Sequence, residues 1–157
     1  TARASPAACR FGSDKAIFGY GVSSGGKVSL TNLVSNTGVV ASDVSGVGTA
    51  RNNLAAAEFG VGKGIFGYGD TGSVSSLTNL VSDLGVVASD VSGVGTARRQ
   101  LGAASYGGDK GVFGYGDSGS RVSLKNLVNN LGVVAADVTG VGTARETLAA
   151  AGYSSSA

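Results

Sequence analysis

Residues 49–69 read TARNNLAAAEFGVGKGIFGYG, and this stretch decides the fold because close copies of it stand at residues 1–21 and 96–116. Its opening tripeptide, Thr-Ala-Arg, begins at positions 1, 49, 96 and 143, so successive copies are 48, 47 and 47 residues apart. A fixed period of this length indicates a repeated supersecondary unit. We divide the chain into unit 1 (1–48), unit 2 (49–95), unit 3 (96–142) and a partial unit 4 (143–157).

Each unit is predicted to contain four short strands. In unit 2, residues 64–69, 74–82 and 86–91 are rich in β-formers and are separated by Gly and Asp turn residues. The Ala-rich segment 54–59 suits a helix or a strand, and its shortness favours a fourth strand. We expect an all-β repeat protein of about 47-residue units that resemble β-propeller blades. The alternative is an open β-rich solenoid with a short helix in each unit.

The order of these segments resembles that of kelch repeats. Thr-Ala-Arg-x-x-Leu-Ala-Ala-Ala followed by Ile-Phe-Gly-Tyr-Gly is similar to the junction between successive kelch repeats, where an Ala-rich strand leads into a strand that ends in a double glycine. The resemblance covers nearly the whole chain and implies a β-propeller fold. It implies no binding residue, because kelch ligands sit on variable loops. The units are also similar to repeats in uncharacterised phage tail-fibre-like and bacterial surface proteins.

The number of units raises the question of closure, because propellers usually close with about 4 to 8 blades. Two chains forming a six-bladed ring, a piece of a longer array and an open stack all remain possible. Unit 4 duplicates the strand expected within residues 1–11. Unit 1 carries Pro6 where the later units have Leu, and Arg10 where they have Glu, Ser and Gly. An unpaired strand edge can add another chain. We predict a homo-oligomer or a longer repeat array, with its assembly joint at Pro6, Arg10, Leu148 and Tyr153.

Composition argues against an enzyme. The chain has no histidine, so the Gly-Asp-Ser-Gly-Ser sequence at 116–120 cannot belong to a Ser-His-Asp triad. The matches to G-x-G-x-x-G at 67–72 and 114–119 precede a strand pattern rather than the helix that a dinucleotide site needs. The 12 basic and 10 acidic residues are scattered, and no apolar run is long enough for a membrane span. We expect no cofactor, no metal, no nucleic acid and no membrane insertion.

Two sets of residues recur in register. An aspartate lies eight residues before an arginine at each unit boundary: Asp43 before Arg51, Asp90 before Arg98 and Asp137 before Arg145. A carboxylate and a guanidinium repeated in register predict one ion pair per unit, as a structural ladder or a solvated loop contact. A Phe and a Tyr recur two residues apart on the Phe-Gly-Tyr-Gly strand, and strand alternation places them on the same face. They either pack between units or form an aromatic platform for sugars, the candidate platform residues being Tyr20, Tyr68 and Tyr115.

Two functions are compatible with these patterns. The first is a structural module that self-assembles into a ring, fibre or surface appendage, outside the cell or on a virion. The second is a lectin-like propeller that binds glycan or protein through its loop tips and the repeated Tyr. The loop tips differ between units whereas the strands persist, which favours the structural module. The single cysteine, Cys9, is expected to be a small buried side chain.

Overall fold

The computed structural model describes residues 1–152, and these form an all-β fold without helices. The first sheet contains β1 (Ala7–Phe11), β2 (Lys15–Gly19) and β5 (Thr31–Val34), and the hairpin of β3 (Val22–Ser23) and β4 (Gly26–Lys27) extends from it. The second contains β6 (Ala55–Phe59), β7 (Lys63–Asp70) and β8 (Val74–Val81), and the third β9 (Gly102–Tyr106), β10 (Lys110–Gly114) and β11 (Lys125–Val128). With no helix among the described residues, none is long and apolar enough to span a membrane.

Each three-stranded antiparallel sheet is formed by one sequence unit, and its strands follow one another in chain order. A fourth segment lies beside the third strand but joins it only through two isolated bridges, which in unit 2 are Val81 with Val87 and Thr78 with Val91. The predicted strand at 86–91 is therefore an extended edge segment rather than a continuous ladder. The two strands predicted at 64–69 and 74–82 correspond to β7 and β8.

The Ala-rich segment is a strand in all three units, as β1, β6 and β9, so the alternative of a short helix per unit is wrong. Burial in β6 alternates: Ala55, Ala57 and Phe59 are buried, whereas Ala56 and Glu58 are half-buried. Pairing with β7 along the whole of β6 outweighs the helix propensity of alanine. The alanines also leave little bulk between neighbouring sheets.

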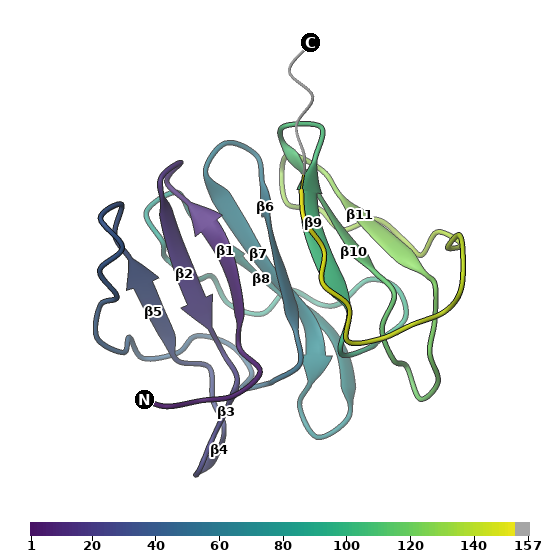
Figure 1. Cartoon of the computed structure of the whole chain (residues 1–157), viewed down its shortest axis with the longest axis horizontal. Coiled ribbons are helices and arrows are strands. Elements are labelled where there is room, and N and C mark those ends of the chain that lie inside the picture. Colours follow the sequence, from purple (N-terminus) through teal and green to yellow (C-terminus); the bar gives the residue numbers. More distant parts are fainter. Residues whose placement is uncertain (153–157) are drawn as a thin grey trace.

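The three sheets lie side by side, with the second between the first and third (Figure 1). The first strands form a row in which β6 contacts both β1 and β9. Two hydrophobic clusters fill the spaces between the sheets, one for each junction. The core of this protein is thus made of contacts between units, and each unit depends on its neighbours for burial of its apolar faces.

Candidate functional site: the junctions between units

An aromatic contact lies at the centre of each junction. Phe66 of unit 2 packs edge-to-face on Tyr20 of unit 1, with ring centroids 5.2 Å apart, and Phe113 of unit 3 packs on Tyr68 at 5.1 Å. A Cβ on Gly67 would lie 2.6 Å from Cζ of Phe113, and the equivalent distance from Gly19 to Phe66 is 2.7 Å. Only glycine fits there. We call each such Gly-Tyr pair, residues 19–20, 67–68 and 114–115, an acceptor site for the Phe of the following unit.

The Phe and Tyr of one strand point to opposite sheet faces, so the prediction of a shared face is wrong. Phe66 lies in the cluster shared with unit 1, whereas Tyr68 lies in the cluster shared with unit 3. The reason is a register shift between Gly67 and Gly69, where Tyr68 adopts a φ of 63°. Such a bulge inserts one residue and inverts the alternation of side chains. The middle unit thereby presents a large aromatic ring on each of its two faces.

This burial does not support the predicted aromatic platform for sugars. The rings of Tyr20 and Tyr68 are fully buried inside the junctions, and burial raises the pKa of Tyr20 to about 12. Tyr115 is half-buried, and its ring face is covered by the guanidinium of Arg145, with Cζ 4.5 Å from the ring centroid. A sugar cannot reach the first two rings, and an arginine already occupies the face of the third.

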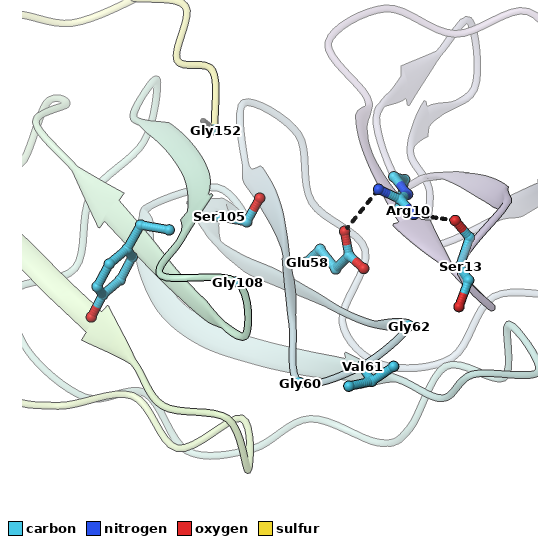
Figure 2. A pocket seen from close by; sticks show the side chains of 10 residues that line it. Arg10, Ser13, Glu58, Gly60, Val61, Gly62, Ser105, Gly108 and Gly152 are labelled. Atoms are coloured by element: carbon cyan, nitrogen blue, oxygen red, sulfur yellow. Dashed lines mark hydrogen bonds and ion pairs between the residues drawn. The ribbon is translucent and has the colours of Figure 1, made fainter. Parts of the chain in front are cut away.

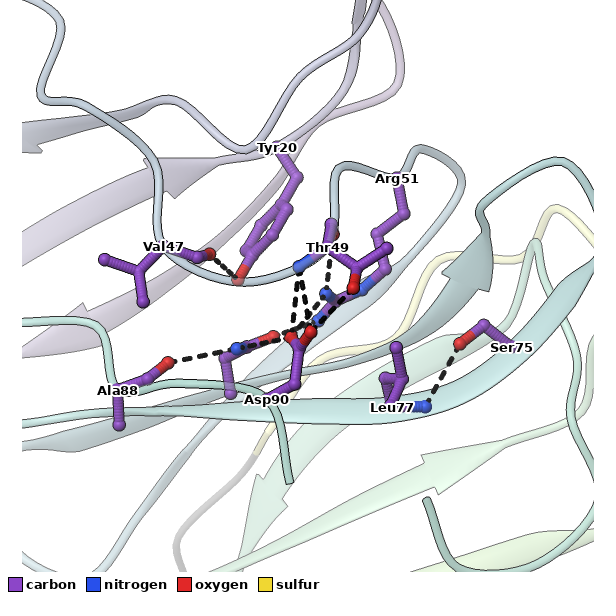
Figure 3. Close-up of polar contacts among 9 residues, drawn as sticks. Tyr20, Val47, Thr49, Arg51, Ser75, Leu77, Ala88 and Asp90 are labelled. Carbon is purple, nitrogen blue, oxygen red and sulfur yellow. Dashed lines mark hydrogen bonds and ion pairs between the residues drawn. The ribbon is translucent and has the colours of Figure 1, made fainter. Parts of the chain in front are cut away.

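The Thr-Ala-Arg tripeptide builds a polar network beside each aromatic contact (Figure 3). Arg51 stacks on the ring of Tyr20, with Cζ 4.3 Å from the centroid, and its Nη2 donates to Oδ1 of Asn79 at 2.6 Å. Asn79 in turn donates to Oδ1 of Asp90 at 2.9 Å. The Thr49 amide and hydroxyl both donate to Oδ2 of Asp90, at 2.9 and 2.6 Å. The network fixes the start of unit 2 to its end and presents a flat cation to unit 1.

The next boundary repeats this network with Arg98, which stacks on Tyr68 at 4.3 Å and donates to Asn126 at 2.6 Å. Arg51 and Arg98 are both fully buried, and burial lowers the pKa of each. A buried guanidinium without partners is costly, whereas here the aromatic ring, amide and carboxylate surround it. These residues are therefore specific to the junction rather than incidental surface pairs.

The structure has one Asp–Arg contact within each of units 1 to 3. Arg51 lies 3.8 Å from Asp90, Arg98 lies 3.9 Å from Asp137, and Arg3 lies 3.6 Å from Asp43. Each arginine pairs with the aspartate near the end of its own unit, not with the one eight residues before it. The antiparallel meander carries the chain back to its start, so residues far apart in one unit meet. Arg145 instead donates to the hydroxyl of Tyr115 at 3.0 Å.

A second polar link joins all three units and was not predicted. Lys27 of unit 1 bonds to Asp70 at 2.5 Å, Arg99 of unit 3 bonds to the same carboxylate at 2.7 Å, and Arg99 also reaches Asp117 at 3.1 Å. Asp70 thus has a cation on either side, and these hydrogen bonds hold its pKa well below the usual range. The sequence signal was weak because unit 1 has Val22 at the position of Asp70 and Asp117.

The predicted joint residues lie along the row of first strands. Pro6 is exposed, Leu148 is half-buried and Tyr153 lies outside the described residues. Arg10 bonds to the carbonyl of Ser13 and lies 3.7 Å from Glu58 of unit 2, so it participates in the internal junction (Figure 2). Among the three described residues, Leu148 is the one that joins unit 4 to unit 3, because it approaches Gly102.

Four equivalent residues of the units gather around one cavity of about 400 Å³: Arg10, Glu58, Ser105 and Gly152 (Figure 2). A second row of equivalents is linked by backbone hydrogen bonds, from Asn53 to Ser5, from Gln100 to Asn53 and from Thr147 to Gln100. The first strands of all three units therefore contribute to one cavity, and their starts are linked to one another by backbone hydrogen bonds.

The comparisons leave the family of the chain open. No protein-family model matches the sequence, and no curated protein matches it closely enough to be a relative. Among residues 1–152, no group of three or more His, Cys, Asp or Glu side chains is placed to hold a metal ion. The repeated junctions between units are the candidate functional site of this chain.

Proposed function

We propose that this protein is a non-enzymatic structural module that self-assembles through its units, as part of a propeller ring, a fibre or a surface appendage. The observation that carries the proposal is the two-sidedness of unit 2. It inserts Phe66 into the acceptor site of unit 1 and receives Phe113 in its own acceptor site. A unit with complementary faces accepts copies of itself on both sides, and such head-to-tail contacts generate rings or filaments.

The cavity shared by the first strands supports a kelch-like β-propeller as the form of this module. In each sheet the chain runs from a first strand beside this cavity, through the second and third strands, to an edge segment, which is the order of a propeller blade. Four equivalent residues around one cavity agree with rotation about a central axis. Three sheets leave such a ring open, and units from a second chain would complete it.

We place the module outside the cell or on a virion. Near-identical units, a low charge content and many Gly, Ser and Thr residues support this location. Antibody labelling of intact cells or particles, compared with lysed ones, tests it. Labelling only after lysis would contradict a surface location.

The self-assembly proposal is tested by the mass of the chain in native buffer. Light scattering after size-exclusion chromatography, at a series of protein concentrations, should give a mass that rises to a multiple of 15.2 kDa. Negative-stain images of the same sample then separate a ring from a filament. A monomer at every concentration would contradict self-assembly.

A second candidate function is recognition of a polar ligand such as a glycan in the cavity of Figure 2. The specific observation in its favour is the lining, where the charged Arg10 and Glu58 lie with Ser13 and Ser105 around one cavity. A few placed charged and hydroxyl groups can orient a polar ligand. Binding to a glycan array that is lost on Glu58→Gln, with the fold retained, would favour this candidate over the structural one.

A further inference from the structure

The outer faces of units 1 and 3 are the two halves of a third junction. Phe18 of unit 1 is 41% exposed, although its equivalents Phe66 and Phe113 are fully buried. At the other end, a Cβ on Gly114 would meet no atom within 4 Å, although its equivalents Gly19 and Gly67 are filled by a phenylalanine ring. One face thus has a phenylalanine without an acceptor site, and the other has an acceptor site without a phenylalanine.

The residues around these two centres match in the same way. On the face of unit 1, Val40 is 56% exposed, whereas Val87 and Val134 at the same position are 9% exposed inside the junctions. Gly38 has no neighbour within 4 Å, whereas its equivalents Gly85 and Gly132 pack against a Phe and a Leu of the preceding unit. The face of unit 3 offers the counterparts of those partners, Tyr106 and Leu127, both half-buried.

From this match we infer that the face of unit 1 binds the face of unit 3 in a second copy of the chain, with Phe18 of one copy inserted into the acceptor site at Gly114 and Tyr115 of the other. The inference rests on the proposed self-assembly and names its joint. The occupant is a second copy because the two internal junctions already join these same surfaces, residue by residue. One difference is Ala16, where units 2 and 3 have glycine. A Cβ on the equivalent Gly111 would lie 3.3 Å from the Glu58 carbonyl oxygen and 3.4 Å from Ala57 Cβ, close contacts that a small shift relieves.

The joint requires one segment to give way. Residues 143–152 lie against unit 3 where the first strand of an incoming unit belongs, since Leu148 and Ala150 approach Gly102. This segment is held by a few polar contacts, among them the backbone hydrogen bond from Thr147 to Gln100, and it forms no strand. Arg145 is exposed, whereas Arg51 and Arg98 are fully buried. The competing strand β1 of the incoming copy is paired along its length with β2. We therefore assign residues 143–152 as the segment that is displaced. They cover the joint until β1 of a second copy takes their place.

The test uses two variants of the full chain. Phe18→Ala removes the inserted ring, and Gly114→Leu fills the acceptor site. Each should weaken self-association by about thirtyfold or more, the effect of losing a central aromatic contact. Both positions are open in the single chain, so both variants should fold, as far-UV circular dichroism would verify. Matched controls are Val61→Ala, at an apolar residue 83% exposed, and Gly25→Leu, where a Cβ meets only the Ser23 hydroxyl at 3.9 Å.

Mixing the two variants supplies the decisive measurement. Each variant retains one intact half of the joint, so an equimolar mixture should form a complex of one copy of each variant and stop there. If the wild-type chain associates but both variants associate equally well, the joint is wrong while self-assembly stands. If the wild-type chain is a monomer at every concentration, self-assembly fails and the joint with it. Failure of both variants to associate, without recovery in the mixture, would exclude the head-to-tail arrangement.

A third variant tests the replacement step. Leu148→Ala loosens residues 143–152 without touching Phe18 or Gly114, so it should strengthen association several-fold. If Leu148→Ala weakens association instead, residues 143–152 are part of the joint rather than its cover, and the assigned replacement is wrong.

Discussion

Arg98 and Arg145 stand in the same tripeptide, and both stack on the tyrosine of the preceding unit, yet their surroundings differ. The guanidinium of Arg98 is fully buried and donates to Tyr115, Thr96 and Asn126. That of Arg145 is exposed and donates to the Tyr115 hydroxyl. The stacking alone is therefore set by the preceding unit, whereas burial and the polar network require the Asn and Asp that follow later in the arginine's own unit. The Thr-Ala-Arg tripeptide therefore forms a buried polar network only where the rest of its unit follows it in the chain.

The largest effect that follows from this comparison concerns Arg98. Arg98→Ala removes the cation from a buried network, so that the side-chain oxygen of Asn126 loses its donor and Asp137 loses its nearby positive charge. We expect a loss of about 3 kcal/mol in the free energy of unfolding. Arg145→Ala removes an exposed stacking contact and should cost less than about 1 kcal/mol. Urea unfolding of both variants measures the difference. Equal losses would mean that stacking, and not the network, holds the junction.

Arg98→Lys is the conservative control for that measurement. Lysine retains the charge but lacks the planar fork that stacks on Tyr68 and donates to three acceptors at once. It should lose a large part of the stability lost in Arg98→Ala. Stability equal to that of the wild type would argue against a structural role for this arginine.

A smaller effect is expected from the tyrosine hydroxyls. The hydroxyl of Tyr68 donates to the carbonyl of Val94 at 3.1 Å inside the junction, and that of Tyr115 donates to the carbonyl of Val141 at 3.1 Å at an exposed site. Tyr68→Phe should cost about 1 kcal/mol, because this hydrogen bond is partly shielded from water, whereas Tyr115→Phe should be nearly neutral. Thermal unfolding followed by circular dichroism checks the pair. A larger loss at Tyr115 would show that the face of unit 3 is already buried in solution.

Much of the fold could be predicted from the sequence. The period of the repeat gave the length of one unit, and the turn residues gave the ends of its strands. The Ala-rich segment was settled in favour of strand by its length, and β6 confirms this. The face of Tyr68 could not be predicted, because a bulge depends on backbone geometry that a regular alternation does not reveal. The partner of Arg51 could not be predicted either, because the repeat places one aspartate before this arginine and another after it. Only the path of the antiparallel meander brings Asp90 to within 3.8 Å of Arg51.

The difference between the end faces was also invisible in the sequence. Phe18 and Phe66 both lie in the sequence Ile-Phe-Gly-Tyr-Gly, so nothing in their local sequence distinguishes the exposed ring from the buried one. Pro6 and Arg10 differ between units, and they line cavities shared by several units rather than the centre of an end face. Residues that differ between units guided the sequence prediction of the joint. The joint inferred from the structure is instead centred on a Phe and a Gly-Tyr pair that are the same in all three units.

The ion pairs that span the junctions should appear in the pH dependence of stability. Lys27 and Arg99 hold the pKa of Asp70 below that of an unfolded chain, near about 3.9. Its contribution is therefore complete above that value and is lost as the pH falls through the lower pKa of the folded state. Asp70→Asn should cost less than about 1 kcal/mol at neutral pH and flatten the loss of stability below about pH 4. Asp117→Asn, where the carboxylate bonds only to Arg99 among cationic side chains in residues 1–152, should change this profile less.

The smallest effect on stability is expected at Cys9, which distinguishes the two internal junctions. Its Sγ packs 2.5 Å from where a Cβ on Gly64 would lie, and the equivalent residue at the next junction is Ala57. Cys9→Ala should therefore change the free energy of unfolding by about 1 kcal/mol or less.

The thiol of Cys9 nevertheless reports on its junction. Burial raises its pKa to about 12, so almost no thiolate is present in the folded chain at neutral pH. Labelling by an alkylating reagent should then require the first junction to open, and its rate should follow the stability of that junction. Arg51→Ala, at the same junction, should accelerate labelling strongly, whereas Arg98→Ala, at the other junction, should accelerate it less. Equal acceleration by both would mean that the three units open together, because weakening the junction between units 2 and 3 would then loosen units 1 and 2 just as much.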